Sequence, residues 1–286
     1  MVRSGKRYNL DDVKQDVESF FLDDNHWAYQ YGSKATSCNK DSVFYGKQLQ
    51  VIFEERYPHD ITSKAVKELA EQDKFLKTVP SVFGKYKNIP IIFVCRRDIR
   101  YTSNEIKRKI VIIDKFSDNS VNDGVGKYAE ILFNHVFEKN QFKIIGKHTN
   151  TFRGKTWRKR GRNLDFIIER DGISYGGEIK NTFDYIPYRE FMEKLEMCQF
   201  LGLLPVFPVR YASPQQYALM KEVGGMALTF KTRIFPPGYR TLVTDIWNHF
   251  RLPVNIWEEI LPPVENRFLS YHHQNLNSYT DREYSV

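Results

Sequence analysis

Hydrophobic residues recur every three or four positions along several stretches of the chain, which is the spacing of one helix face. In the first hundred residues this pattern predicts three helices. Their ranges are 10–22, 44–57 and 64–77. Thr62 or Ser63 would cap the third helix. Two strand-like runs follow at 79–83 and 89–95, and a basic turn at 84–88 joins them into a hairpin.

The order helix, helix, turn, helix and basic hairpin is that of a winged helix-turn-helix. In such a module the last helix enters the major groove of DNA with its N-terminal residues leading. The predicted DNA contacts are Thr62, Ser63, Lys64 and Lys67 on this helix, with Lys85 and Lys87 on the wing binding phosphate. Modules with the same order of elements also mediate protein contacts, so both interpretations stay open.

From residue 102 onward, helical and strand-like patterns alternate. Helices are predicted over 123–140, 188–202 and 214–223, and strands over 142–148, 164–170, 173–181, 206–211 and 226–231. Three antiparallel strands followed by a helical crossover and further strands predict the α/β (α+β) class. We therefore expect a mixed central sheet flanked by helices, preceded by the small winged-helix domain.

These patterns divide the chain into three parts. Residues 1–101 would form the winged-helix domain, 102–253 the domain with the mixed sheet, and 254–286 a C-terminal extension. From Glu265 the sequence is polar and rich in Asn, Ser and Tyr, so we expect this extension to be partly disordered or to dock late. The length of 286 residues agrees with two domains at about 150 residues each.

Composition excludes several classes of protein. Apolar residues make up 41% of the chain and charged residues 27%, which is typical of a globular protein. No apolar run reaches the roughly 20 residues of a membrane helix, and the start lacks the pattern of a signal peptide. Cys38, Cys95 and Cys198 are too far apart for a disulfide framework or a zinc site. We therefore expect a cytoplasmic protein with no membrane partner.

Positive charge is concentrated in one stretch, residues 139–164, which contains no acidic residue. Its basic residues are Lys139, Lys143, Lys147, Arg153, Lys155, Arg158, Lys159, Arg160 and Arg162. The net charge of the whole chain is +8, so this stretch accounts for all of the excess. Such a concentration attracts polyanions, and nucleic-acid phosphate is the obvious one. Trp157 would either stack on a base or anchor the loop to the core.

The dipeptide Asp171-Gly172 fixes the register of two strands. It indicates a type I′ hairpin turn, in which both central residues have positive φ. Arg170 then pairs with Ile173. The same register places Asp165 directly opposite Glu178, with Cβ atoms about 5 Å apart. Lys180 points to the same face as Glu178, because side chains alternate along a strand.

Two carboxylates directly opposite each other destabilise a sheet unless something offsets their repulsion. Lys180 could act as an ordinary counter-ion, or a divalent cation could bridge Asp165 and Glu178. Mg²⁺ is commonly held by one or two carboxylates with waters and phosphate oxygens, and it promotes phosphodiester hydrolysis. Lys180 could then hold the attacking water or stabilise the phosphate transition state. Gly176 and Gly177 would allow close approach by a ligand or another backbone.

The string Leu164-Asp165, twelve residues, then Glu178-Ile179-Lys180 resembles the PD-(D/E)XK nuclease superfamily. It departs from the motif at Leu164, where the family has Pro. The resemblance covers about residues 123–231 and implies four catalytic residues. These are Glu130, Asp165, Glu178 and Lys180. It also implies Mg²⁺, with Mn²⁺ as an alternative ion, held by the three carboxylates and the backbone carbonyl of Ile179. Gln199 would be an accessory residue on the following helix.

The resemblance implies a metal-dependent DNA endonuclease, and the separate N-terminal module favours a type II-like restriction enzyme. Double-stranded DNA would be its partner, and a homodimer would cut both strands by analogy with the family. One alternative is a Holliday-junction or other structure-selective repair nuclease. Another is a DNA-binding protein on an inactive nuclease core. Glu130 could be only a solvated helix residue, and His148, His272 and His273 are expected to be structural or exposed.

Overall fold

The computed structural model describes residues 8–29, 39, 41–72, 76–81, 91–159 and 162–283. The chain forms two compact units, and the described residues of each come from two separate stretches of sequence. One comprises Asp123–Gly238 with Asn255–Val286, and the other comprises Gly5–Asn122 with Tyr239–Val254. The boundaries predicted at residues 101 and 253 therefore divide the chain differently. The chain leaves the N-terminal unit only after Asn122 and returns to it at Tyr239.

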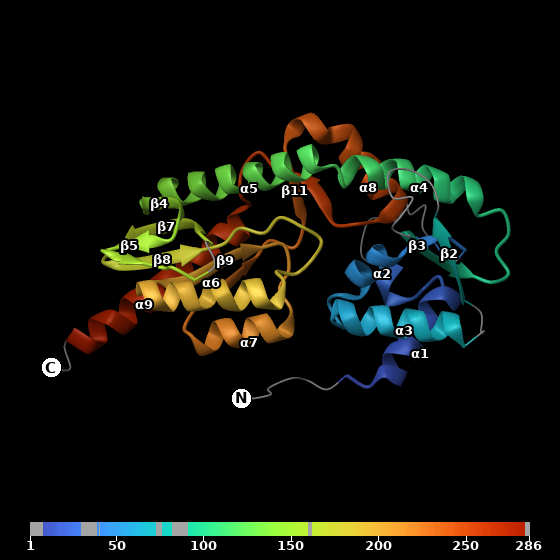
Figure 1. Cartoon of the computed structure of the whole chain (residues 1–286), viewed down its shortest axis with the longest axis horizontal. Coiled ribbons are helices and arrows are strands. Elements are labelled where there is room, and N and C mark those ends of the chain that lie inside the picture. The colour runs from blue at the N-terminus through green and yellow to red at the C-terminus, as the bar shows by residue number, and fades with distance from the viewer. Residues whose placement is uncertain are drawn as a thin grey trace. The chain divides into compact units, whose positions relative to one another are not determined.

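The unit that contains Asp123–Gly238 is built on a mixed five-stranded sheet with the order β10-β9-β8-β7-β4 (Figure 1). Its strands are β4 (Lys143–Thr149), β7 (Leu164–Arg170), β8 (Ile173–Gly177), β9 (Leu204–Val209) and β10 (Met226–Thr229). Strands β8, β9 and β10 are parallel neighbours, whereas β4, β7 and β8 are antiparallel. The predicted mixed sheet is thus confirmed.

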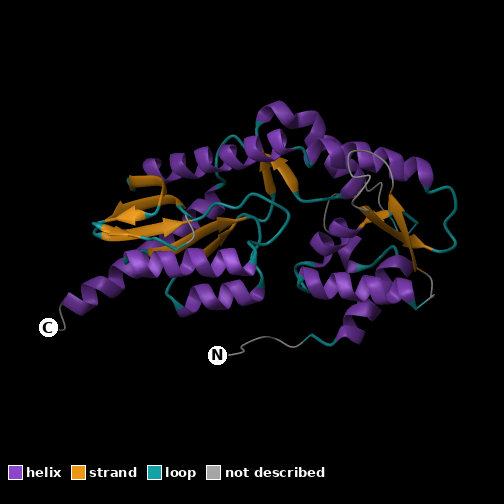
Figure 2. Cartoon of the chain, viewed as in Figure 1, coloured by secondary structure: helices purple, strands orange, loops and turns teal. Residues whose placement is uncertain are grey.

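Helices cover both faces of this sheet (Figure 2). They are α5 (Asn119–Lys139) and α9 (Pro262–Glu283) on one face, with α6 (Tyr188–Leu201) and α7 (Pro214–Glu222) on the other. Alternate residues of β7 face the two layers. Phe166 and Ile168 pack with α5 and α9, while Ile167 packs with α6. Two short pairs complete the unit. They are β5 (Thr151–Phe152) with β6 (Lys155–Thr156), and β11 (Arg233–Phe235) with β12 (Val254–Ile256).

The hairpin turn at Asp171-Gly172 forms as predicted. Asp171 has a φ of 51° and Gly172 a φ of 75°, the positive values that a type I′ turn requires. Arg170 pairs with Ile173, and the same register continues to the pair Phe166 and Gly177. A two-residue sequence signal therefore fixed the alignment of both strands. The predicted strand 173–181 is shorter in the structure, because β8 ends at Gly177.

The two glycines at the end of β8 allow close packing against neighbouring parts of the protein. A Cβ atom on Gly177 would lie 1.9 Å from the backbone oxygen of Val206, and one on Gly176 would lie 2.7 Å from a methyl group of Leu203. Of the two predicted reasons for these glycines, approach by another backbone is the one that the structure supports.

Of the C-terminal stretch that was expected to be partly disordered or to dock late, the described residues from Glu265 to Glu283 form part of a long helix, α9, which packs on the sheet. Phe268 is buried in the core beneath the sheet, and His272 is fully buried. Glu265 accepts hydrogen bonds from Lys139 and Asn140 at the end of α5. Few apolar residues are enough to hold this helix, because its contacts fall on one face.

The N-terminal unit contains a three-stranded antiparallel sheet with the order β1-β3-β2. Its elements are α1 (Leu10–Leu22), β1 (Phe44–Tyr45), α2 (Gly46–Phe53), α3 (His59–Glu71), β2 (Leu76–Ser81), β3 (Ile91–Arg96), α4 (Ser103–Phe116) and α8 (Arg240–Phe250). The first helices enclose an aromatic core around Phe20, which contacts Phe44 and Phe53.

The predicted bounds of two helices in this unit are wrong. Phe44 and Tyr45 are in strand β1 because they pair with Val94 and Phe93 of β3, so the second helix begins only at Gly46. The third helix begins at His59 and ends at Glu71, earlier at both ends than predicted. Its N-cap is Pro58, and proline is tolerated at a helix start because an N–H group there would have no acceptor within the helix. Thr62 and Ser63 therefore lie inside the helix and do not cap it.

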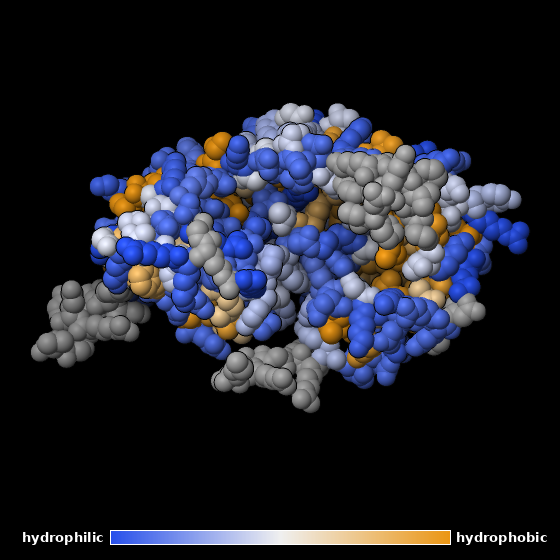
Figure 3. Space-filling model, viewed as in Figure 1, coloured by the Kyte–Doolittle hydropathy of each residue, from blue (hydrophilic) through white to orange (hydrophobic). Residues whose placement is uncertain are grey.

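The visible surface is mainly hydrophilic, with small separate hydrophobic patches (Figure 3). Within the described part of the chain, no helix is long and apolar enough to cross a membrane.

Candidate active site

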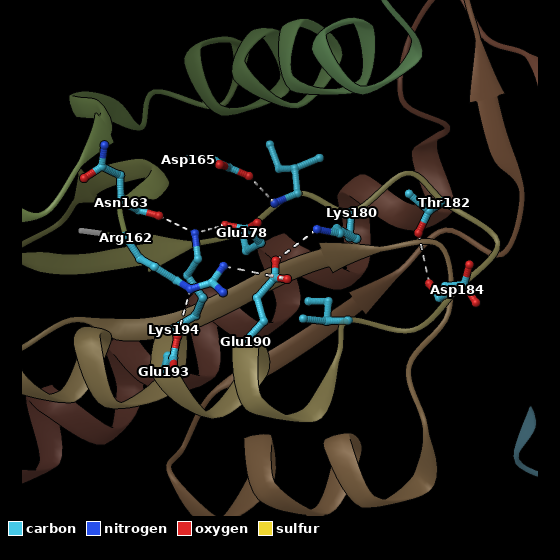
Figure 4. A network of polar contacts seen from close by, with 12 residues as sticks. Arg162, Asn163, Asp165, Glu178, Lys180, Thr182, Asp184, Glu190, Glu193 and Lys194 are labelled. Carbon is cyan, nitrogen blue, oxygen red and sulfur yellow. Dashed lines mark hydrogen bonds and ion pairs between the residues drawn. The ribbon is translucent and has the colours of Figure 1, made fainter. Parts of the chain in front are cut away.

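The predicted carboxylates of the two paired strands come together at the end of the sheet. Asp165 is the second residue of β7, and Glu178 directly follows β8, one step beyond the last pair of the ladder. The backbone N–H of Ile179 donates a hydrogen bond to Asp165 Oδ2 at 2.7 Å (Figure 4). This bond ties the Asp165 carboxylate to the segment that carries Glu178. The predicted ladder pair Asp165–Glu178 does not form, because the ladder ends at Phe166 and Gly177, but Asp165 is close enough for its charge to raise the pKa of Glu178.

The cation that contacts Glu178 is Lys194 of α6, which sequence reasoning missed. Lys194 Nζ donates to Glu178 Oε2 and to the backbone oxygen of Asn163 (Figure 4). Only 5% of Lys194 is exposed, and only 7% of Glu178. A signal was present in the sequence, because Lys194 lies three residues after Phe191 and four before Cys198, on the inward face of the predicted helix.

Lys180 is paired with a different residue of α6. Its Nζ atom lies 2.9 Å from Glu190 Oε1 (Figure 4). Its backbone N–H donates to the oxygen of Pro208. Lys180 is therefore not the direct counter-ion of Glu178, which was one of the two predicted roles. Glu190 also lies 3.8 Å from Arg162 Nη1. One turn of α6 thus supplies a cation, Lys194, to Glu178 and an anion, Glu190, to Lys180.

Glu130 of α5 reaches the same region through a histidine. His148 Nε2 lies 3.2 Å from Glu130 Oε2, and His148 Nδ1 lies 4.0 Å from Asp165 Oδ1. The side chain of His148 is 62% exposed, in agreement with the expectation of an exposed histidine, although its position between two acids was not predicted. Its φ of 46° turns the backbone near the end of β4.

Burial makes negative charge at this site unfavourable. Burial and the nearby Asp165 raise the pKa of Glu178 to about 7. Burial also raises the pKa of Asp165 and that of Glu130, and His148 opposes the rise at both residues. These carboxylates are more stable in the ionised form when a cation is close. Lys194 supplies part of that positive charge.

The donor atoms suit a hard divalent cation, but the carboxylates do not form a closed ligand cluster. Among the described residues, no group of three or more His, Cys, Asp or Glu side chains is arranged so that it could hold a metal ion. Mg²⁺ does not require one, since one or two carboxylates with waters and phosphate oxygens are its usual ligands. Asp165 and Glu178 supply two such carboxylates. The residues therefore fit Mg²⁺ by donor chemistry.

The basic loop is partly neutralised by acidic residues of the same unit. Arg153 lies 2.7 Å from Glu169, and Lys159 lies 3.4 Å from Glu196. Arg162 pairs with Glu193 at 2.8 Å. Lys155 donates to the backbone oxygen of Phe200. Arg158 is exposed, and Arg160 lies outside the described residues.

Trp157 anchors this loop to the core. Only 5% of its surface is exposed, it packs against Phe200, and its backbone N–H donates to Asn150. The structure thus favours the second of the two predicted roles for this residue.

Gln199, the predicted accessory residue, is exposed on α6. It follows Glu190 by nine residues, which corresponds to two and a half turns, so it lies on the opposite side of the helix. Only the family resemblance had suggested it.

The predicted DNA-binding residues of the N-terminal unit are only partly available to a ligand. Thr62 is buried and its hydroxyl donates to the backbone oxygen of Pro58, so it cannot lead a helix into a groove. Ser63 accepts a hydrogen bond from Gln50. Lys64 and Lys67 are exposed, and each lies within 4.0 Å of a glutamate one turn further along α3. Lys85 and Lys87 lie outside the described residues.

Comparison with protein-family models, with curated proteins and with solved structures finds no match for this chain.

Proposed function

We propose that the protein is a metal-dependent DNA endonuclease of the PD-(D/E)XK kind. The observation that supports this proposal is the convergence of Asp165, Glu178 and Lys180 at the end of one sheet, with Glu130 linked to them through His148. These groups come from separate elements. A buried acid, Glu178, beside a half-buried acid, Asp165, lowers the stability of the fold, and such arrangements cluster at functional sites.

The residues have distinct roles in this proposal. Asp165 and Glu178 would hold Mg²⁺, assisted by Glu130 and the backbone carbonyl of Ile179. When bound, the metal would polarise the phosphoryl oxygen and lower the pKa of a bound water. Lys180 would stabilise the negative charge that develops on the phosphate. Glu190 would keep the Lys180 side chain in place through the contact at 2.9 Å.

Double-stranded DNA is the proposed substrate. The loop from Arg153 to Arg162 leads along the chain to Asp165 and would bind the phosphate backbone. The N-terminal unit would act as a winged helix, since its order of helices and strands and its sheet order β1-β3-β2 suit that module. A restriction-like activity, with two copies cutting the two strands, is the preferred form. A structure-selective repair nuclease is the alternative.

A cleavage assay with and without Mg²⁺ tests this proposal. Wild type and Lys180→Ala would be compared on plasmid, methylated plasmid, single strands and a four-way junction. Arg189→Ala, which removes an exposed charge from α6, serves as the control. We expect Mg²⁺-dependent cutting by wild type and the control, and loss of cutting with retained DNA binding in Lys180→Ala. The preferred substrate separates restriction from repair.

A DNA-binding protein without nuclease activity is the second candidate. One observation favours it, namely that Glu178 and Glu130 already contact positive or ionisable side chains, Lys194 and His148. DNA binding by wild type with no cutting under Mg²⁺ or Mn²⁺ on any of the four substrates would support this candidate and rule out the nuclease.

A further inference from the structure

The two charged residues at Glu178-Ile179-Lys180 are matched by two charged residues on one face of α6. Glu190 contacts Lys180 and Lys194 contacts Glu178, and Glu190 and Lys194 are four residues apart, which places them one turn apart on the same face. Two ion pairs therefore join α6 to the segment after β8. In one pair the helix supplies the acid, and in the other it supplies the base. Such an arrangement fixes α6 against the end of the sheet at the proposed catalytic site.

Lys194 differs from Glu190 in being buried. Its ammonium group has the carboxylate of Glu178 and the backbone oxygen of Asn163 as hydrogen-bond acceptors. Both acceptor groups lie at the end of the β7 and β8 pair, where Asp165 also lies (Figure 4). Coulomb attraction between Lys194 and Asp165 adds to the effect. An ammonium group thus lies where a cation is needed, surrounded by oxygen atoms.

We infer that Lys194 is an internal counter-cation that takes the place of the divalent metal at Glu178. This inference rests on the proposed function, because it concerns how metal binds at the same site. In the metal-free protein, Lys194 offsets the repulsion between Asp165 and Glu178. A metal ion entering the site has to displace the ammonium group from Glu178. Lys194 therefore lowers the affinity for metal and keeps the metal-free protein folded.

Competition between Lys194 and metal predicts opposite effects of one substitution on two measurements. Lys194→Met removes the charge and keeps a long side chain. Lys194→Gln removes the charge but keeps a donor for the two oxygen acceptors. Without metal, both variants leave the buried Glu178 and the half-buried Asp165 without this cation, so their unfolding temperature falls below that of wild type. With the competitor gone, Mn²⁺ binds about tenfold more tightly or better.

Mn²⁺ binding would be measured on the full chain by electron paramagnetic resonance of the free ion. The unfolding temperature would be measured with and without saturating Mg²⁺. Arg189→Met is the matched control, because it removes one positive charge from α6 at an exposed position whose partner is Glu193. In the two Lys194 variants we expect tighter Mn²⁺ binding and a larger rise in unfolding temperature with Mg²⁺. The control should match wild type in both readouts.

The other outcomes either overturn the inference or, in one case, support it. If wild type binds Mn²⁺ and the Lys194 variants bind it equally or more weakly, Lys194 is not a competitor, and the nuclease proposal stands without it. If wild type binds neither Mn²⁺ nor Mg²⁺, both proposals fail together. A variant that is unfolded alone but folds with Mg²⁺ supports the inference, whereas one that stays unfolded in saturating Mg²⁺ contradicts it.

Discussion

Gly177 shows how tightly single residues constrain the end of the sheet. A side chain at this position would have its Cβ atom 1.9 Å from the oxygen of Val206 and 2.5 Å from the ring of Phe166. Since the oxygen belongs to the backbone of β9, it cannot move without disturbing the pairing of the strands. The absence of a side chain at residue 177 therefore positions Glu178 next to Asp165.

We expect Gly177→Ala to lower the free energy of unfolding by about 3 kcal/mol or more, because overpacking against backbone cannot relax locally. Urea unfolding followed by circular dichroism measures the change. Gly126→Ala is the control, since Gly126 lies in α5 with no atom near its missing Cβ. That change should stabilise the protein by about 0.5–1 kcal/mol. An equal effect of the two substitutions would refute the packing argument.

His272 is a buried histidine whose charge state affects stability. Its Nδ1 atom lies 2.9 Å from the hydroxyl of Tyr175, and its Nε2 atom lies 3.0 Å from Asp171 Oδ2. Burial lowers the pKa of His272 below its usual value, more than the hydrogen bond with Asp171 raises it. The unfolded chain then binds a proton more readily than the folded protein as the pH falls through about 6.5. The contribution of His272 to stability is therefore complete above that pH and declines below it.

Urea unfolding at pH 8 and pH 5 tests this for wild type and His272→Gln. Glutamine can keep hydrogen bonds and does not titrate. We expect a smaller loss of unfolding free energy between the two pH values in the variant. The pKa of Asp171 is lowered by its hydrogen bond with His272, so its own contribution is lost only at pH values below about 4, outside this range. Identical losses in the two proteins would show that His272 does not titrate on unfolding.

The residues of the candidate site could be predicted to the extent that local signals define them. The Asp171-Gly172 turn fixes the register, and the register brings Asp165 and Glu178 together. Their partners could not be derived in the same way. Lys194 and His148 reach the acids only because α6 and β4 pack beside them, and hydrophobic periodicity does not define which polar side chain of an element meets which neighbour.

At the scale of elements, the wrong predictions concern segments in which tertiary contacts outweigh the local preference of the sequence. Phe44 and Tyr45 suit a helix face by spacing, but pairing with β3 places them in a strand. The C-terminal stretch has few apolar residues, yet Phe268 and His272 hold it against the sheet as α9. Helix α1 and strand β7 had the predicted bounds, because the hydrophobic pattern of each agrees with its environment.

We expect the arginines of the basic loop to contribute unequally to nucleic-acid binding. Arg158 is exposed, whereas Arg153 is held by Glu169 at 2.7 Å. If the loop binds phosphate as proposed, Arg158→Ala weakens binding to duplexes of any sequence and reduces the slope of log K against log salt by about 1. Fluorescence anisotropy over a series of salt concentrations measures this slope.

Arg153→Ala should reduce the slope less, because part of its charge is already used within the protein. Lys221→Ala removes an exposed charge from α7, outside the loop, and should leave the slope unchanged. A slope that stays the same in Arg158→Ala would show that phosphate is not bound by this part of the loop.

At the scale of the whole molecule, each unit is assembled from two stretches of chain. The helix α8 lies more than a hundred residues after α4 in sequence, yet both belong to the N-terminal unit. Phe250 of α8 contacts the rings of Phe116 and Tyr45 there. Sequence patterns could not predict this, since they describe neighbours along the chain and α8 follows the other unit. A fragment that ends at the predicted boundary of residue 101 would lack both α4 and α8.

This assembly predicts that a core substitution in α8 destabilises the N-terminal unit, although α8 is near the C-terminal end of the chain. Phe250 is fully buried, so Phe250→Ala should lower the stability of its unit by about 3–5 kcal/mol. Hydrogen exchange measured by mass spectrometry should then accelerate in α1, α2 and β3 while β7 and β8 keep their protection. Phe268→Ala in α9 is the reciprocal control and should expose β7 and β8 instead. Equal acceleration in both units for either variant would mean that the chain unfolds as one cooperative body, and the division into two units would then have no thermodynamic meaning.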